Sequence, residues 1–402
     1  MKILALSPHI PAPMAGASTR DYYLLKALAS QHEVTLLTLD ESVIEGVARN
    51  TGDLKQFVKG LQIIESGPAL AKRQAQLQAA LSGQSYLLSR SILPQMQEAI
   101  DAAFSRETFD AVFCESIMLT GYRLPPDVAL VIDEHNLEYE LCWRTYRQTR
   151  PGLRKLYSWL EARKLQPEEL KRCRAASQVL VTSERELLEL KRLAPASVIA
   201  LVPNGVDTLF FQPPDPAEEK EQSIIYTGAM DYYPNTDAVL QFASVCWPGI
   251  KARLPGATWM IVGKNPPPQV QRLGEFPGVT VTGSVVDVRP YLAQAALAIA
   301  PLRIGSGTRL KILEAFAMQK AVVSSKIGCE GLKVTDKAHL LVADEPDHFI
   351  HAVVELLEDA SARERLGQAG RKLAESEYSW DASGQRLIQA LATLQIENRK
   401  SE

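Results

Sequence analysis

The stretch "PLRIGSGTRLKILEAFAMQKAVVSS", residues 301–325, joins a short apolar strand end, a loop bracketed by two glycines, a helical pattern and a second apolar strand. A glycine loop that leads into a helix presents backbone N–H groups and the positive end of the helix dipole, which favour an anion such as phosphate. Arg309 and Lys311 add cationic side chains. The spacing lacks the lysine–serine ending of a Walker A loop. The stretch therefore predicts a strand–helix–strand unit whose loop is either a phosphate site or a plain turn.

The helix within this stretch places Lys311 and Glu314 on one face, one turn apart. One interpretation is an ion pair on a solvated face, worth roughly 0.2–0.5 kcal/mol. In the other, Glu314 lies one turn beyond a phosphate site and accepts hydrogen bonds from the diol of a ribose. Phosphate followed by a diol acceptor describes a nucleotide site. The two residues alone do not decide between these interpretations.

Apolar strand patterns alternate with helical patterns, such as the one at 18–31, on both sides of the chain's midpoint. Strands that are apolar throughout, with helices between them, indicate parallel sheets covered on both faces. Glycines end three of the later strands, which favours a binding rim at the carboxyl ends of those strands. These glycines are Gly228, Gly263 and Gly283. The expected strands are 3–7, 33–39, 109–114, 128–136, 177–183, 197–205, 224–228, 258–263, 279–283, 297–302, 321–325 and 339–343.

A segment rich in proline and charge, "QPPDPAEEKEQS" at 212–223, interrupts this alternation. The predicted fold class is therefore α/β, with two doubly wound Rossmann-like domains facing each other across a cleft. The length of 402 residues fits two domains of about 200 residues each. The last segment is helical and is expected to pack back on the first domain. The predicted bounds are 1–205 for the first domain, 206–223 for a linker, 224–378 for the second domain and 379–402 for the last helix.

Composition narrows the class of protein. The net charge of −3 offers no footprint for nucleic acid. The five cysteines form no C-x-x-C pair, which argues against a disulfide framework or a zinc site and suits a reducing cytosol. The first apolar run is too short for a signal peptide. These features predict a cytoplasmic protein.

Several motifs together resemble one known family. They are 301–323, "YTGAMDYYPNTDAV" (226–239), "MIVGKNPP" (260–267), "VTVTGSVVDVRPYLAQA" (279–295), "ALVPNGVD" (200–207) and "YSW" (378–380). The chain resembles the retaining GT-B glycosyltransferases of family 4, densely in its second half and more thinly in its first. The resemblance implies transfer of a sugar, with retention of configuration, from a UDP- or GDP-sugar to a hydroxyl of a glycan, a lipid-linked or a small-molecule acceptor. The first domain would be the acceptor side and the second the donor side.

In that family the second glutamate of a Glu-x7-Glu motif binds the ribose, and Glu314 matches it. The first glutamate, which touches the donor sugar, is Ser306 here, so backbone N–H groups of the loop 305–308 are expected to hold the sugar or the β-phosphate. The loop "GAMDYYPN", which is often cationic in relatives, carries no cation. Val285 lies in a turn that resembles the one that reads the base. The resulting donor-binding candidates are Lys264, Val285, Arg303, Gly305, Gly307, Thr308, Arg309, Lys311 and Glu314.

The resemblance adds four residues of the first domain or its edge. The loop "PAPMAGASTR" (11–20) resembles the family's glycine loop, with Gly16 and Arg20 as donor-binding candidates; an ordinary loop is the alternative. His135 matches a histidine placed against the donor sugar, for orientation and charge stabilisation rather than proton abstraction. His135 and Ser306 are the catalytic candidates, and Glu115 is an acceptor-side candidate.

No metal and no cofactor are expected. Preorganised N–H groups, a helix N-terminus and cations can meet the charge that develops on a leaving diphosphate, and no Asp-x-Asp motif is placed to hold a metal. The leaving phosphate oxygen would accept the acceptor's proton on the same face of the sugar. The alternatives are a nucleotide-sugar epimerase, which needs no acceptor, and a non-catalytic nucleotide-sugar binder, which the serine at 306 suggests.

One segment departs from neutrality. Residues 144–174 contain ten Lys or Arg against three Glu, interleaved with aromatic and leucine residues. A basic amphipathic stretch can dock on an anionic membrane surface, although a solvated helix face is the common alternative. The segment predicts a peripheral protein on the inner face of the membrane.

Overall fold

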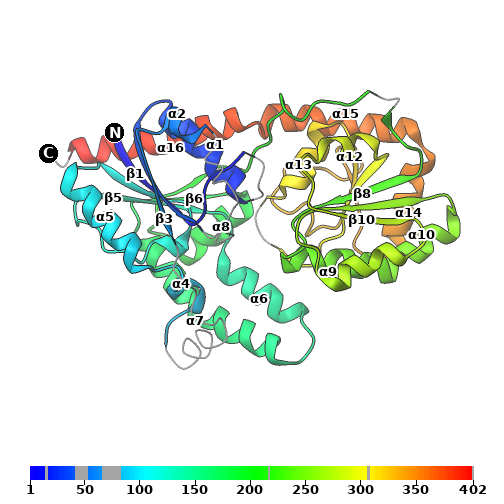
Figure 1. The fold of residues 1–402 in the computed structure, drawn as a ribbon, viewed down its shortest axis with the longest axis horizontal. Coiled ribbons are helices and arrows are strands. Elements are labelled where there is room, and N and C mark those ends of the chain that lie inside the picture. Colours follow the sequence, from blue (N-terminus) through cyan, green and yellow to red (C-terminus); the bar gives the residue numbers. More distant parts are fainter. Residues whose placement is uncertain (14–16, 41–52, 66–82, 216–217, 306–307, 401–402) are drawn as a thin grey trace. The chain divides into compact units, whose positions relative to one another are not determined.

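The computed structural model describes residues 1–13, 17–40, 53–65, 83–215, 218–305 and 308–400. The chain forms two compact units. Unit 1 comprises Met1–Pro203 together with Ser383–Glu402, and unit 2 comprises Asn204–Ala382. Each unit is described by itself below, with the labels of Figure 1.

The described residues of unit 1 form a sheet of seven parallel strands in the order β3-β2-β1-β4-β5-β6-β7. The order reverses direction after β1, as in doubly wound folds. All carboxyl ends therefore meet at one edge of the sheet. The strands are β1 (Lys2–Ser7), β2 (Glu33–Asp40), β3 (Gly60–Glu65), β4 (Ala111–Cys114), β5 (Ala129–Glu134), β6 (Gln178–Val181) and β7 (Ile199–Leu201).

Helices cover both faces of this sheet because its strands are apolar on both sides. In β1, Ile3 and Ala5 pack into the cluster on the α1 face, and Leu4 and Leu6 pack into the cluster on the α5 face. The helices of unit 1 are α1 (Ala17–Ala29), α2 (Leu54–Phe57), α4 (Tyr86–Ser89), α5 (Pro94–Arg106), η1 (Ile117–Leu119), α6 (Glu138–Gln148), α7 (Leu153–Ala175), α8 (Glu184–Leu193) and α16 (Trp380–Lys400), of which α16 begins in unit 2.

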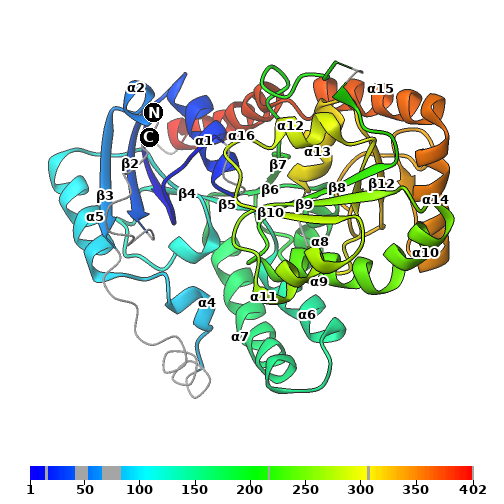
Figure 2. The same ribbon diagram turned by 45° about the vertical axis from the view of Figure 1, so that its right-hand side comes forward.

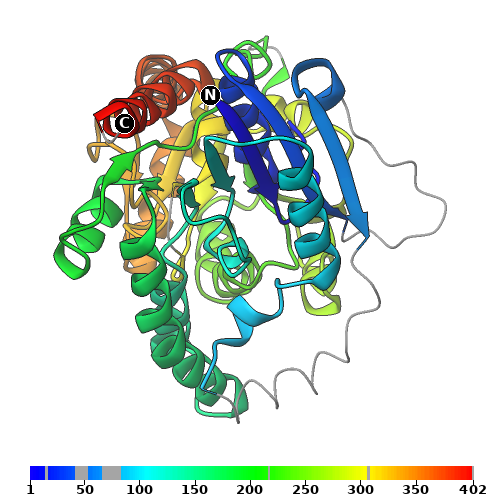
Figure 3. The same ribbon diagram turned by 90° about the vertical axis from the view of Figure 1, so that its left-hand side faces the viewer.

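Helix α16 lies beside α1 on one face of the first sheet (Figures 1 and 3). Its Leu387, Leu391 and Leu394 are buried in the same cluster as Leu24 of α1. A carbon built on Gly384 would lie 2.8 Å from the methyl of Ala27, so the two helices approach closely there. The last helix therefore completes the core of unit 1.

The described residues of unit 2 form a second parallel sheet, of six strands, in the order β10-β9-β8-β11-β12-β13. This is again a doubly wound order. The strands are β8 (Ser223–Thr227), β9 (Thr258–Val262), β10 (Val279–Gly283), β11 (Leu297–Ala300), β12 (Ala321–Ser324) and β13 (Leu341–Val342). The helices are α9 (Tyr233–Gln241), η3 (Phe242–Cys246), α10 (Trp247–Arg253), α11 (Pro268–Gln271), η4 (Arg272–Glu275), α12 (Arg289–Gln294), α13 (Leu310–Ala317), α14 (Pro346–Glu358) and α15 (Ala360–Glu377).

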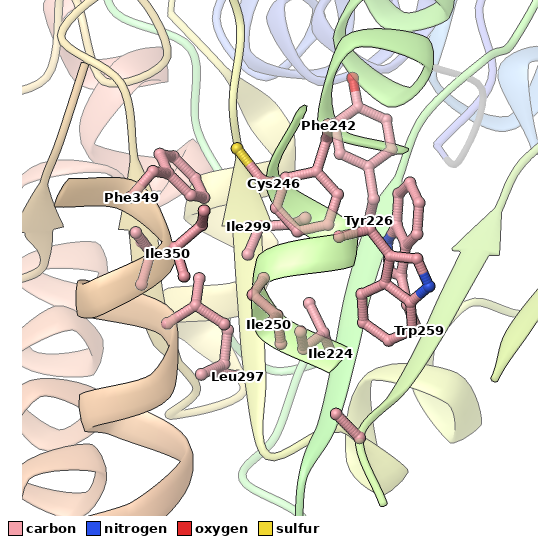
Figure 4. Packing of buried hydrophobic residues seen from close by; sticks show 14 of the residues in the cluster. Ile224, Tyr226, Phe242, Cys246, Ile250, Trp259, Leu297, Ile299, Phe349 and Ile350 are labelled. Carbon is pink, nitrogen blue, oxygen red and sulfur yellow. The ribbon is translucent and has the colours of Figure 1, made fainter. Parts of the chain in front are cut away.

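An aromatic cluster anchors one face of the second sheet (Figure 4). The ring of Phe242 meets Trp259 edge to face, with 4.7 Å between their centroids, and it meets Phe349 of α14 in the same way. Helices α10 and α14 close this face (Figure 2). Helix α13 covers the opposite face through Ile312, Leu313 and Phe316 and their neighbours. Because the apolar side of α13 faces the sheet, its polar residue Lys311 can reach the carboxyl edge of the sheet.

The α/β class and the two doubly wound sheets are as predicted, but three details differ from the predictions. Strand β3 was not expected; its sequence "GLQIIE" is only half-buried, so it lacks the continuous apolar pattern of the other strands. The predicted linker 206–223 belongs to unit 2, where the apolar Val206 and Phe211 are buried. The first unit also resumes at Ser383, slightly later than the start predicted for the last helix.

Candidate functional site

Glycines form a rim at the carboxyl edge of the second sheet. A carbon built on Gly263, after β9, would lie 1.7 Å from the carbonyl oxygen of Gly228, after β8. The backbone N–H of Gly228 donates to Val262, and that of Gly263 donates to Gly283. Gly228 and Gly283 also have positive φ values of 151° and 70°, a region that side chains other than glycine rarely adopt. The three strand ends therefore bring bare backbone together at one edge.

Lys311 projects from the first turn of α13 to this rim. Its Nζ donates to Oδ1 of Asn235 at 2.8 Å and lies 3.8 Å from the centre of the Tyr226 ring. A carbon on Gly228 would meet the same Nζ at 3.0 Å. The ammonium thus occupies the end of β8, the loop that carries no cation of its own.

Asn235 is held in the orientation that Lys311 requires. The Tyr226 hydroxyl donates to its Oδ1 at 2.7 Å, and its Nδ2 donates to the carbonyl of Ala229 at 2.8 Å. Tyr226 is itself buried in the aromatic cluster (Figure 4). The position of the ammonium is therefore set by the core rather than by a flexible loop.

Lys311 and Glu314 do not form the ion pair that was one interpretation of their spacing. Within the described part of the chain, no carboxylate lies at ion-pair distance from the Lys311 ammonium, and the carboxylate of Glu314 accepts no hydrogen bond. Desolvation lowers the pKa of Lys311, with the nearby Arg309 adding to the effect. Desolvation raises the pKa of Glu314 to about 7, against the opposing charge of Lys311. A phosphate and a diol would each supply one of these groups with its missing partner.

The loop between β11 and α13 lies against the same rim. Gly305 has a φ of 152°, and a carbon there would collide with the guanidinium of Arg309. Thr308 is buried, and its carbonyl accepts from Asn204 at 3.2 Å. No described side chain caps the first turn of α13. Ser306 and Gly307 lie outside the described residues.

The remaining donor-side candidates make other contacts. Arg303 forms a bidentate pair with Asp237, at 3.0 and 2.7 Å, so its guanidinium is already engaged. Lys264 is exposed after β9, and its carbonyl accepts from Met230. Val285, in the loop after β10, packs partly against the core. The structure thus brings Gly305, Arg309, Lys311 and Glu314 to one loop and helix end. The other three candidates follow strand ends of the same sheet: Lys264 follows β9, Val285 follows β10 and Arg303 follows β11.

The carboxyl edge of the first sheet holds a different cluster. His135 follows β5, and its Nε2 lies 3.0 Å from Oδ1 of Asp21 and 3.2 Å from Oδ2 of Asp133. The other oxygen of Asp21 is 2.8 Å from Nε2 of His9, which follows β1. One buried carboxylate of α1 therefore joins two imidazoles from two strand ends.

Arg20 takes part in this cluster as a buried ion pair. Its guanidinium donates to both oxygens of Asp133, at 2.7 and 2.6 Å, and both side chains are almost completely buried. In this position Arg20 holds Asp133 against His135. Its assignment to donor binding stays a prediction, and Gly16 lies outside the described residues.

Glu115, the acceptor-side candidate, follows β4 and is completely buried. Neither of its carboxyl oxygens has a hydrogen-bond partner among the described residues. Burial, and then the negative charge of Asp21, raise the pKa of Glu115 well above its usual range. Burial and the neighbouring negative charge therefore favour the protonated form of Glu115.

Two family models match successive parts of the chain. The first, described as Glycosyltransferase Family 4, matches residues 14–209. The second, described as Glycosyl transferases group 1, matches residues 221–359. Together they span most of the chain and divide it close to the boundary between the two units.

The chain is a glycosyltransferase of the GT-B type. Solved structures with this fold are similar along the whole length. Sucrose-phosphate synthase from Thermosynechococcus elongatus matches with a TM-score of 0.74 at 18% identity, covering 99% of this chain and 100% of that one. Anabaena HepE in complex with UDP and glucose matches with a TM-score of 0.69 at 14% identity, covering 98% and 99%.

A variant of S. aureus TarM, solved with fondaparinux, α-GlcNAc-glycerol and UDP, matches this glycosyltransferase with a TM-score of 0.69 at 9% identity, covering 97% and 99%. At such identities the similarity shows the fold. No curated protein matches the chain. No described helix of the glycosyltransferase is both long and apolar enough to cross a membrane.

Four residues of these clusters were not singled out in the sequence. Asp21 directly follows the candidate Arg20, and His9 lies just before the loop 11–20. Their separation of twelve positions does not indicate that the two side chains meet. Asn235 and Tyr226 lie in the stretch 226–239 that carries part of the resemblance, yet their contact with Lys311 depends on tertiary packing. His9 could have been found from its position, because it is a polar residue two positions after the buried strand β1.

Proposed function

We propose that this glycosyltransferase moves a sugar from a nucleoside diphosphate sugar to a hydroxyl group, with retention of configuration and without a metal ion. One observation carries the proposal. The ammonium of Lys311 stands at the glycine rim without a carboxylate partner among the described residues, and the carboxylate of Glu314 stands one turn further along α13. This pair matches a diphosphate followed by a ribose diol.

The diphosphate would lie against the bare backbone of Gly228 and Gly263 and the first turn of α13, which no described side chain caps. Lys311, with Arg309 near it, would meet the negative charge that develops as the bond to the sugar breaks. The acceptor oxygen forms the new bond to the anomeric carbon, the diphosphate leaves with the bonding electron pair, and a phosphate oxygen takes the acceptor's proton. Bond formation and departure on one face retain the configuration.

The first unit contributes His135, which we assign to the donor sugar, and Glu115, which we assign to the acceptor side. The carboxylates of Asp21 and Asp133 support retention through the leaving phosphate because they are buried and paired with His135 and Arg20 rather than presented as a nucleophile. Gly16 and Ser306 keep their assigned roles at the β-phosphate and the donor sugar. The cations and N–H groups at the rim support a metal-independent reaction, which should proceed unchanged in EDTA.

A UDP-sugar is the first donor to test, because two of the similar structures contain UDP. A thermal-shift screen of UDP, GDP and ADP against wild type, Glu314→Ala and Glu355→Ala decides the point. A ligand at 100 times its dissociation constant adds about 2.7 kcal/mol of stability. We expect UDP to stabilise wild type and Glu355→Ala, whose residue is exposed on α14, and Glu314→Ala clearly less. Equal stabilisation of all three proteins, or none of wild type, would overturn the proposal.

The release of UDP separates this transferase from the two alternatives. A transferase releases UDP from UDP-glucose only when an acceptor sugar is added. An epimerase converts the donor without an acceptor, and a non-catalytic binder does neither. The serine at position 306 keeps the binder as the second candidate, and acceptor-dependent UDP release would eliminate it.

The acceptor we propose is a glycan or lipid-linked sugar at the cytoplasmic face of a membrane. Helices α6 and α7 form a hairpin that extends away from the first sheet (Figure 1). Near its tip, Leu153 is 87% and Leu156 52% exposed, beside the exposed Arg147, Arg150 and Arg154. Exposed leucines among cations suit an anionic lipid surface. Replacing the three arginines by alanine should abolish sedimentation with phosphatidylglycerol vesicles; unchanged sedimentation would remove the membrane from the proposal.

A further inference from the structure

Among the described residues, Arg20, Asp21 and Asp133 surround His135 with buried charges. Asp21 and Asp133 bring two carboxylates to within 3.0 and 3.2 Å of the same ring nitrogen, and neither carboxylate is exposed. The guanidinium of Arg20 neutralises one negative charge through its bidentate pair with Asp133. With a neutral His135, the set would carry an uncompensated negative charge in a buried place. With a protonated His135, its charges sum to zero.

The balance matters because a buried, uncompensated charge costs several kcal/mol, whereas a paired one costs much less. A guanidinium carries its positive charge at all ordinary pH values. Burial raises the pKa of Asp133, but the charges and hydrogen bonds of Arg20 and His135 together lower it overall. Burial likewise opposes ionisation of Asp21, and the charge of His135 and its hydrogen bond reverse this. Each carboxylate thus depends on a neighbouring cation.

The other described groups that face His135 are two carboxyl groups, a hydroxyl and a second imidazole. After β4, burial and the charge of Asp21 raise the pKa of Glu115. In α6, burial raises the pKa of Glu138, although the charge of His135 opposes the rise. After β6, Thr182 donates to the carbonyl of His135. After β1, His9 contacts the other oxygen of Asp21 and is more exposed than His135.

We propose that Asp21 and Asp133, the latter fixed by Arg20, keep His135 as an imidazolium, so that in the role assigned to it toward the donor sugar its ring is always a hydrogen-bond donor. This deepens the proposed function, on which the role toward the donor rests. Burial by itself would lower the pKa of His135, but the charges and hydrogen bonds of Asp21 and Asp133 raise it to about 10.

An imidazolium has a different chemistry from a neutral imidazole. Its Nε2 lies within ion-pair distance of the two carboxylates, and in the imidazolium both ring nitrogens, Nδ1 included, carry a proton. His135 therefore donates a hydrogen bond and cannot act as a general base. Asp21, Asp133 and Arg20 are positioning residues, since they act on the reaction only through His135.

The direct test is the protonation state of His135, followed through its ring nitrogens by NMR between pH 5 and 10. In the wild-type protein we expect His135 to stay protonated beyond pH 8. In Asp21→Asn it should lose its proton at a pH at least one unit lower, a tenfold loss of proton affinity. The control Asp53→Asn removes a carboxylate that binds the Tyr22 hydroxyl of α1 instead, and it should leave His135 unchanged.

A wild-type His135 that titrates near its ordinary value would overturn the inference, and so would a titration unaffected by Asp21→Asn. The wild-type measurement decides alone if the variant does not fold. Because it needs no substrate, its failure is distinct from a failure of UDP binding. Once a donor is known, sugar transfer by wild type at saturating donor should stay constant between pH 6 and 8.5, whereas transfer by Asp21→Asn at saturating donor should fall as the pH rises across its lowered titration.

Discussion

At the carboxyl edge of the first sheet, the charged side chains are buried and paired with one another, from Arg20 through Asp133 to His135 and Asp21. At the same edge of the second sheet, Lys311 is held only by a neutral amide and an aromatic ring, and Glu314 accepts no hydrogen bond from the described residues. The two edges have the same strand order around them. The two edges differ in pairing. The charged side chains of the first edge have partners of opposite charge, whereas Lys311 and Glu314 at the second edge have none among the described residues.

Mutation should affect the two edges differently. The first edge is a complete set, in which each charge has a partner of opposite charge, and the second is an incomplete set, in which the charges have none among the described residues. Removing one member of a complete buried set leaves its partner uncompensated, so stability falls. Removing a member of an incomplete set should cost little stability, because under the proposed function its partner would be a ligand. The comparison thus supports a structural and electrostatic role for the first edge and the proposed binding role for the second.

The largest expected effect is on stability, for Asp133→Asn. This change leaves the buried Arg20 without its carboxylate, and breaking such a pair costs about 3–5 kcal/mol. Asp237→Asn is the matched control, since it breaks the same bidentate geometry where Arg303 is 41% exposed, and exposed pairs are worth about 0–1 kcal/mol. Thermal unfolding measures both variants. Similar losses in the two variants would show that burial does not make the Arg20–Asp133 pair more costly to break than the exposed pair.

Gly263→Ala should be next. The added carbon would overlap the carbonyl oxygen of Gly228, and such overpacking costs about 1–3 kcal/mol when the backbone has to move. UDP binding should weaken in parallel because the rim itself shifts. At Gly274 the nearest atom would be 3.9 Å away, so Gly274→Ala should change neither quantity. Full retention of UDP affinity by Gly263→Ala would separate the rim from the binding site.

Lys311→Met should leave the melting temperature within a few degrees of wild type and weaken UDP. A charge-assisted hydrogen bond contributes about 1.5–3 kcal/mol, which corresponds to roughly 10- to 100-fold in the dissociation constant. The loss should be much smaller for uridine, which has no phosphate. Calorimetry with both ligands measures the difference, and Lys372→Ala, on the exposed side of α15, is the control. An equal loss for UDP and uridine would place the ammonium away from the phosphates.

The smallest effect concerns pH. Because the pKa of Glu314 is raised to about 7, part of the carboxyl is protonated at neutral pH and accepts fewer hydrogen bonds from a diol. Its ionised fraction grows as the pH rises, so UDP affinity should increase a few-fold between pH 6 and 8 relative to Glu314→Gln. Taking the ratio of the two proteins removes the titration of the phosphate and of Lys311. A constant ratio would contradict the assignment of Glu314 to the diol.

Local patterns explain why much of the fold was predictable. Continuous apolar strands such as 297–300 and 321–324 indicate a parallel sheet. The face shared by Lys311 and Glu314 follows from helix geometry alone. Strand β3 was not predictable because it lies at the sheet edge and is only half-buried. Helices with a clear apolar side, such as α13, were the easiest to place.

The partners of the charged residues were not predictable. Arg20 and Asp133 are 113 positions apart, and only the packing of α1 beside β5 brings them together. The sequence offered Arg20 as a free cation and Lys311 with Glu314 as a plausible ion pair, whereas the structure pairs the first and separates the other two. Burial and neutral partners such as Asn235 decide which cation lacks a carboxylate partner. Neither can be deduced from the spacing of residues along the chain.

The path of α16 has a consequence for the order of events during synthesis. Leu387, Leu391 and Leu394 complete the core around β1 and α1, but they follow the whole of unit 2 in the chain. At roughly 5–20 residues per second, the intervening stretch of about 180 residues takes on the order of 10–35 s to translate. During that interval the nascent first unit exposes the apolar groove that α16 will fill, and a chaperone on the ribosome has time to bind it.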